Sequence, residues 1–172
     1  MSEPLQQPDR SGSQPPAKKL DSVVRRWWTG LDERRGDRAE LRRARTPSTV
    51  AFLPAYHGFV RELAQAGIYL SGETAAVVAA VVAHVRRDDP SRSFAKQMAS
   101  EHNGKARVSG LRFRRMLTID DAAELQTSLV RTIHLLDGTA SVGDLSTSIR
   151  WWNDRTKKRW ASEYYETAPN ED

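Results

Sequence analysis

The stretch "GETAAVVAAVVAHVRR", residues 72–87, is apolar on almost every side when it is placed on a helix. A helix that is apolar all round belongs inside a domain, so we expect this one to lie at the centre of the fold. Ser71 stands where a capping residue would begin it. The valines between Ala75 and Val85 make a buried strand the competing interpretation, but the length of the segment and its alanine content favour a helix.

Amphipathic segments on both sides of this stretch predict further helices, and there is almost no strand signal. Before it, helices are expected to begin at Asp21, near Asp37, at Thr46-Pro47 and at Pro54, the last one closed by Gly67. After it, helices are expected over residues 91–101, over 111–119 with Leu111, Met116 and Leu117 facing inward, from Asp120 or Asp121 to Gly138, and from near Ser141 or Asp144 to about Tyr165. Residues 102–110 are expected to form a polar loop. The predicted fold class is therefore all-α.

Asp88-Asp89-Pro90 ends the central helix and is taken as the boundary between two small helical bundles packed together. The predicted organisation is an N-terminal bundle of residues 20–88 and a C-terminal bundle of residues 89–166. Residues 1–19 are rich in Pro, Ser, Gln and Gly and are expected to be a disordered tail. Residues 167–172 are acidic and are expected to be frayed.

The composition indicates a soluble protein with an affinity for polyanions. There are 27 Lys and Arg against 22 Asp and Glu, and the excess is mostly Arg, whose planar fork of donors fits phosphate. With no cysteine, disulfides, Cys-ligated zinc and thiol nucleophiles are excluded. The first residues lack the apolar core of a secretory signal, and the longest apolar run is too short to cross a bilayer. We expect a cytoplasmic location and no membrane association.

Signatures of catalysis are absent from the sequence. There is no HExxH, Walker loop, nucleophile elbow or GxGxxG. His84 and Asp88 are four residues apart, but no third ligand converges on them. His102, beside Glu101 and near Lys105, is the one combination that could support acid–base work on RNA. A polar loop histidine is the simpler interpretation. We expect neither enzymatic activity nor a metal or cofactor, and a nuclease using His102 is the enzymatic rival.

Basic residues gather in three clusters. The first is Arg34, Arg35, Arg38, Arg42, Arg43 and Arg45, diluted by acidic neighbours; the second is Lys105, Arg107, Arg112, Arg114 and Arg115; the third is Arg150, Arg155, Lys157, Lys158 and Arg159. The first can also be read as a solvated helix face with mixed charge. No acid interrupts the second between His102 and Thr118, so it is the strongest candidate for a polyanion-binding site.

The segment "IRWWNDRTKKRWASEYY", residues 149–165, alternates aromatic and basic residues. On one continuous helix, Arg150, Lys157 and Lys158 share a side. Trp152 and Trp160 fall mainly on another side and are expected to lie in the core or at an interface. Trp151 lies off the apolar centre, so stacking on a nucleotide base stays open for it.

The order of these features resembles the CasB family, the small subunit of the type I-E CRISPR surveillance complex Cascade. The resemblance is carried by "VVRRWWTGLD", "RAELRRARTPSTVAFLPAYHGFV", "SFAKQMAS", "SGLRFRRMLTIDDAAELQTSLVRTIHLL" and "IRWWNDRTKKRWASEYY", and it covers about Leu20 to Tyr165. It implies two helical bundles, no enzymatic activity, and two copies along the inner side of the complex beside its backbone and large subunits.

The resemblance also implies partners and site residues. The partners are the crRNA, the target DNA and the displaced DNA strand, with stabilisation of the R-loop. The positions that match the nucleic-acid-facing surface are Lys105, Arg107, Arg112, Arg114, Arg115, Arg150, Lys157 and Lys158, with Arg42, Arg43 and Arg131 matching more loosely. The alternative from another class is a helical scaffold or adaptor that binds an acidic protein.

Overall fold

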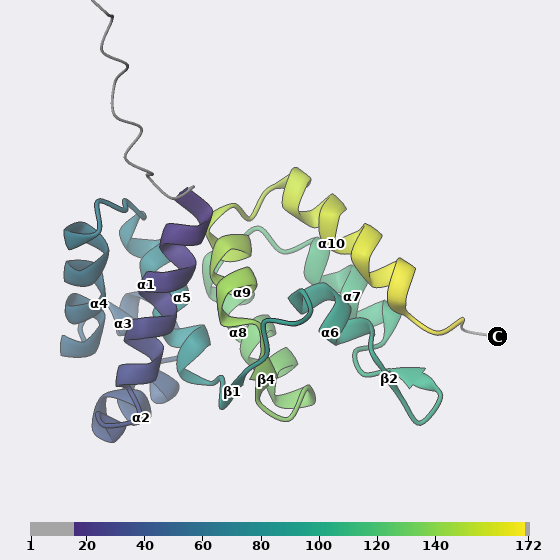
Figure 1. The fold of residues 1–172 in the computed structure, drawn as a ribbon, viewed down its shortest axis with the longest axis horizontal. Coiled ribbons are helices and arrows are strands. Elements are labelled where there is room, and N and C mark those ends of the chain that lie inside the picture. Colours follow the sequence, from purple (N-terminus) through teal and green to yellow (C-terminus); the bar gives the residue numbers. More distant parts are fainter. Residues whose placement is uncertain (1–15, 171–172) are drawn as a thin grey trace, which may run out of the picture.

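The computed structural model describes residues 16–170, and it is mostly helical, as the sequence predicts (Figure 1). The elements of this part of the chain are α1 Pro16–Gly30, α2 Arg35–Arg43, α3 Pro47–Val50, α4 Pro54–Gln65, α5 Gly72–Ala83, β1 Arg87–Asp88, α6 Phe94–Ala99, β2 Glu101–His102, β3 Lys105–Ala106, α7 Gly110–Leu117, α8 Ala122–Leu135, β4 Thr139–Ala140, α9 Val142–Arg150 and α10 Asp154–Thr167.

The apolar stretch that begins at Gly72 forms the central helix, α5. Its cap is confirmed, because the Ser71 hydroxyl accepts a hydrogen bond from the backbone N–H of Thr74 at 3.1 Å. Each residue from Ala75 to Ala83 is buried, and α2, α3, α4, α8 and α9 pack around the helix. The competing interpretation of this stretch as a strand is therefore wrong.

Helix α1 begins earlier than the sequence predicts. It starts at Pro16, so Asp21 lies within the helix and does not cap it. The predicted tail thus ends inside α1, and its first fifteen residues lie outside the part of the chain that is described. Val23, Val24 and Trp27 are buried, as their spacing predicts.

Helix α1 packs along α9, which joins the first and last thirds of the chain (Figure 1). The buried apolar residues form one continuous cluster from Leu20 to Tyr164. On the side of α6, α7 and α10, Phe94 packs against Trp160 with ring centroids 5.6 Å apart, and Phe113 stacks on Tyr164 at 4.0 Å. The division into bundles of residues 20–88 and 89–166 stays a prediction.

Two short pairs of strands interrupt the helices. β1 pairs with β4 in parallel, matching Arg87 with Thr139, and β2 pairs with β3 in a hairpin. The hairpin begins at Glu101, the last residue of the helix predicted over 91–101, and otherwise lies within the predicted polar loop; its turn places Asn103 and Gly104 at positive φ. Lys105 is carried on this hairpin.

The last predicted helix is wrong as a continuous element, because it is divided into α9 and α10. Asn153 caps α10, accepting a hydrogen bond from the N–H of Thr156 at 3.1 Å, and the Thr156 hydroxyl donates to the carbonyl oxygen of Trp151. Asn153 followed by Asp154 in the first turn is a helix-start signal that the aromatic pattern obscured. The shared helical face assigned to Arg150, Lys157 and Lys158 therefore does not exist.

The inward face of α7 also differs from the prediction. Met116 is buried and Leu117 packs partly buried against the core, as predicted, but Leu111 is 53% exposed and Phe113 is buried. The core contact of α7 is the stacking of Phe113 on Tyr164, and this contact fixes the rotation of the helix. With that rotation, Leu111 points away from the core.

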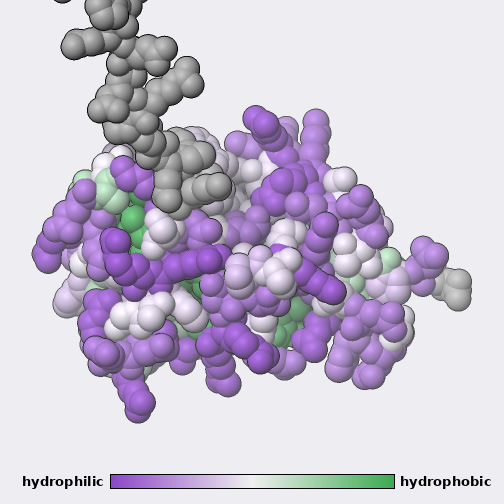
Figure 2. Space-filling view, in the orientation of Figure 1, coloured by the Kyte–Doolittle hydropathy of each residue, from purple (hydrophilic) through white to green (hydrophobic). Residues whose placement is uncertain are grey.

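Most of the surface seen in Figure 2 is hydrophilic, and hydrophobic residues show only in small patches. Within residues 16–170, no helix combines the length and the apolar character needed to cross a bilayer.

Candidate nucleic-acid interface

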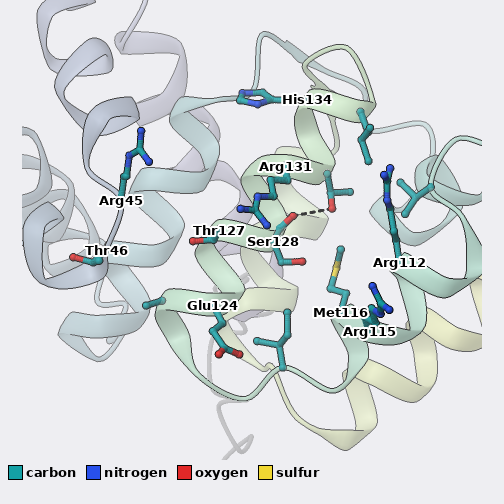
Figure 3. Close-up of a pocket in the computed structure, with 15 residues that line it drawn as sticks. Arg45, Thr46, Arg112, Arg115, Met116, Glu124, Thr127, Ser128, Arg131 and His134 are labelled. Atoms are coloured by element: carbon teal, nitrogen blue, oxygen red, sulfur yellow. Dashed lines mark hydrogen bonds between the residues drawn. The ribbon is translucent and has the colours of Figure 1, made fainter.

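An open groove of about 930 Å³ lies beside α7 and α8 and reaches the turn between α2 and α3 (Figure 3). We call it the basic groove. The apolar part of its lining includes Val108, Met116, Ile119, Ala123 and Leu135. The charged or titratable part is Arg45, Arg112, Arg115, Arg131, His134 and Glu124.

The four arginines of the basic groove come from three separate segments. Arg112 and Arg115 lie one helical turn apart on α7, Arg131 lies on α8, and Arg45 comes from the turn after α2 (Figure 3). All four side chains are exposed, and Glu124 is the one acidic residue in the lining. A hollow lined by one sign of charge concentrates counter-ions, so the groove suits a polyanion.

Local capping positions these side chains. The Ser109 hydroxyl accepts a hydrogen bond from the N–H of Arg112 and begins α7, and the Asp121 carboxylate accepts from the N–H of Glu124 and begins α8. The long helix predicted from Asp120 or Asp121 therefore starts with Asp121 as its cap. These fixed starts place the arginines of both helices along one groove.

A buried hydrogen bond attaches the fourth arginine to the same site. The Gln126 side chain on α8 donates to the carbonyl oxygen of Ala44 at 3.0 Å. This bond holds the turn that carries Arg45 against α8. Because Arg45 and Arg131 lie far apart along the chain, no spacing in the sequence could have joined them.

His134 extends the basic groove toward a second histidine. Its ring centroid lies 5.2 Å from that of His84, at an interplanar angle of 66°. Burial, followed by the charges of His134 and Arg42, lowers the pKa of His84 from 6.5 to about 4. His84 is therefore neutral at physiological pH.

Three of the predicted site residues lie in the basic groove: Arg112, Arg115 and Arg131. Two others from the second cluster have intramolecular contacts. Arg107 pairs with Asp137 at 3.2 Å, and Arg114 donates to the Tyr165 hydroxyl at 3.4 Å. These contacts lie outside the groove.

A smaller hollow of about 450 Å³ surrounds Arg107. Arg87 and Arg92 line it together with Asp89 and Asp137, so its charge is mixed. This mixture makes it a weaker polyanion site than the basic groove.

The two predicted arginines of α2 differ from each other. Arg42 is half-buried, and its Nε donates to the carbonyl oxygen of Ala83 at 2.7 Å. Arg43 is exposed. Arg42 thus satisfies a carbonyl at the end of α5, whereas Arg43 is open to a ligand.

The predicted site residues on α9 and α10 also differ in the contacts that they make. The ammonium group of Lys157 donates to Asp120 and lies 5.5 Å from the ring centroid of Trp152. Lys158 is exposed, and the guanidinium carbon of Arg150 lies 4.9 Å from the ring centroid of Trp151. Lys157 therefore contacts an acidic and an aromatic residue of its own chain, which the sequence pattern did not predict.

Within residues 16–170, no three or more His, Asp or Glu side chains come together as a metal site would require. His102, the candidate acid–base residue, is exposed on the β2–β3 hairpin and lies outside the lining of both hollows.

Fold and site together define a small helical protein with an open, arginine-lined groove. The model of the family described as CRISPR-associated protein Cse2 matches residues 37–165, which is most of the chain. The chain therefore belongs to this family, as the resemblance to CasB predicts, and it is a small structural subunit of a CRISPR Cascade complex. Neither curated proteins nor solved structures yielded a match.

Proposed function

We propose that this chain is the non-catalytic, sequence-independent nucleic-acid-binding small subunit of a type I-E Cascade, working in antiviral defence in the cytoplasm. It holds the backbones of the crRNA and target DNA and the displaced strand, and so stabilises the R-loop. Its neighbours in the complex are a second copy of the chain, the backbone subunits and the large subunit.

The observation that carries this proposal is the convergence of four exposed arginines on one groove with a single acid. Guanidinium groups bind phosphate oxygens in pairs of hydrogen bonds and remain charged at any physiological pH. Such contacts position a nucleic acid without reading its sequence. The groove therefore suits a backbone and not a particular base order.

A guided complex needs only this kind of contact from its small subunit. Sequence is read by base pairing between guide and target, and the exchange of one duplex for another is nearly balanced in free energy. A few phosphate contacts to the heteroduplex or to the displaced strand are then enough to favour the open R-loop. The Cse2 family membership supports the same conclusion.

Measurement of binding to single-stranded DNA, duplex DNA and RNA at several salt concentrations tests the proposal. We expect the affinity to fall steeply as salt rises and to vary little between unrelated sequences. Binding that is absent at low salt, or insensitive to salt, would contradict it. Tight binding of an acidic protein by a chain that ignores nucleic acid would favour the adaptor alternative.

A further inference from the structure

We infer that Trp151, together with Arg150, forms a stacking site for an unpaired nucleobase, beside the basic groove. This inference rests on the proposed function, since it names what part of a nucleic acid the surface takes. The ligand that the turn between α9 and α10 binds is then a single strand and not a duplex.

The two neighbouring tryptophans of this turn have opposite environments. The indole N–H of Trp152 donates to the carbonyl oxygen of Ile119 at 2.7 Å, and the ring packs edge-on against Trp160. Trp151 is 53% exposed. Because Trp152 already serves the packing, Trp151 is not needed as the anchor of this turn.

The backbone of Trp151 is held firmly although its side chain is exposed. Its N–H donates to the carbonyl oxygen of Thr147 at 3.1 Å, and its own carbonyl oxygen accepts from the Asn153 N–H and the Thr156 hydroxyl. A turn whose backbone is already ordered loses less conformational entropy when a ligand stacks on its aromatic side chain. The turn therefore presents the indole ready for contact.

A cation already lies on this ring. The guanidinium carbon of Arg150 is 4.9 Å from the ring centroid of Trp151, which is cation–π range. Arginine over an exposed indole is a combination that stacks with bases and attracts phosphate together. The exposed aromatics Phe52 and Tyr69, in contrast, have no cation–π contact within the described residues.

The charge around the turn and its location favour a nucleic acid strand as the occupant. Arg155 and Lys158 are exposed nearby, with Asp154 as the neighbouring acid. Ile119, which accepts the hydrogen bond from Trp152, also lines the basic groove. A strand whose phosphates lie in the groove could thus continue to Trp151.

The test compares the full chain with Trp151→Ala and Trp151→Phe, using a short oligo-thymidine strand and an abasic strand of the same length. Tyr69→Ala is the matched control, since Tyr69 is 83% exposed on the loop between α4 and α5. Thermal unfolding of each variant verifies that it is folded.

We expect Trp151→Ala to weaken binding of oligo-thymidine by about fivefold or more, the usual effect of removing one stacked aromatic. Binding of the abasic strand should not change, and the salt dependence should keep its slope because every cation that binds phosphate is still present. Trp151→Phe should retain most of the affinity. We expect thymidine to quench the tryptophan fluorescence of the unsubstituted chain, and this quenching should be lost in Trp151→Phe. Tyr69→Ala should bind both strands normally.

Equal affinity of Trp151→Ala and the unsubstituted chain for oligo-thymidine would overturn the stacking site and leave the polyanion function standing. An equal decrease in affinity for both strands would also overturn it, because the indole would then serve the backbone or the fold. If neither strand binds even at low salt, the stacking site and the proposed function both fail.

Discussion

The Nε of Arg42 donates a hydrogen bond to the carbonyl oxygen of Ala83 at 2.7 Å, which connects the end of α2 to the end of the central helix. Burial, followed by the charges of Arg38 and Arg86, lowers the pKa of Arg42 from its ordinary value. The guanidinium is thus a structural partner of α5, although its sequence neighbours suggested a surface cation.

Arg42→Ala should lower the free energy of unfolding by about 1–3 kcal/mol, because the Ala83 carbonyl loses its hydrogen-bond donor in a partly buried place. The adjacent Arg43→Ala is the matched control, since Arg43 is exposed on the same helix. It should leave stability nearly unchanged and weaken nucleic acid binding slightly. Denaturant unfolding of both variants measures the difference, and equal stabilities would contradict the structural role of Arg42.

Arg112→Ala combined with Arg115→Ala should reduce the affinity for duplex DNA with little change in stability, because both side chains are exposed in the basic groove. The plot of log affinity against log salt concentration should become less steep, by about 0.9 for each phosphate that the variant no longer neutralises.

The matched control is the double variant of Arg35 and Arg61, which are exposed and lie outside the groove. It removes the same charge from the chain. If it weakens binding as much as the groove variant does, net charge and not the groove is responsible. If the groove variant unfolds at a much lower temperature, its arginines are structural.

Helix positions were predictable where the signal is local. The Ser71 cap, the Thr46-Pro47 start and the apolar run of α5 are all read from a few adjacent residues, and the structure confirms them. The break at Trp151 to Asn153 was missed because aromatic periodicity outweighed a cap that was also present.

The candidate site was only partly predictable because the fold assembles it from segments that lie far apart in the sequence. Arg112 and Arg115 were identified from an uninterrupted run of basic residues, but Arg45 joins them through the Gln126 to Ala44 hydrogen bond, which no spacing encodes. Lys157 looked free because Asp120, its partner, lies 37 residues away. The order of charges along a chain cannot tell a paired cation from an unpaired one.

Gly143→Ala should destabilise the fold, because a Cβ at that position would lie 2.3 Å from the Asp21 carboxylate. Asp21 is held by Arg25 at 2.7 Å, so it cannot move without breaking that pair. Either the Asp21 side chain or the packing of α1 against α9 would have to shift, at a cost of about 1–3 kcal/mol as for other overpacked sites.

Gly36→Ala is the control for this prediction, since nothing lies within 4 Å of a Cβ there. Alanine in α2 should leave stability equal or slightly higher, because glycine is the poorer helix former. Denaturant unfolding compares the two. A stable Gly143→Ala protein would show that the carboxylate of Asp21 has room to turn away.

His84 should make stability depend on pH in the acidic range. Its folded pKa is about 4, below the ordinary 6.5, so the unfolded chain binds the proton more readily than the folded one. The neutral imidazole therefore contributes stability that is fully present above pH 6.5 and is lost as the pH falls from 6.5 to 4. The loss should be about 1–2 kcal/mol, less than the pKa difference alone implies, because the ring is partly open to solvent.

His84→Gln isolates this contribution, since glutamine fills a similar space and does not titrate. Unfolding free energies of both proteins are measured from neutral pH down to pH 4. The chain with His84 should lose stability relative to His84→Gln as the pH falls, because protonation penalises only the chain with His84. Arg42 and His134 are the neighbours whose charges act on the His84 ring, and both are present in both proteins. A stability difference that stays constant over this range would mean that His84 titrates normally and that its surroundings are better hydrated than its burial suggests.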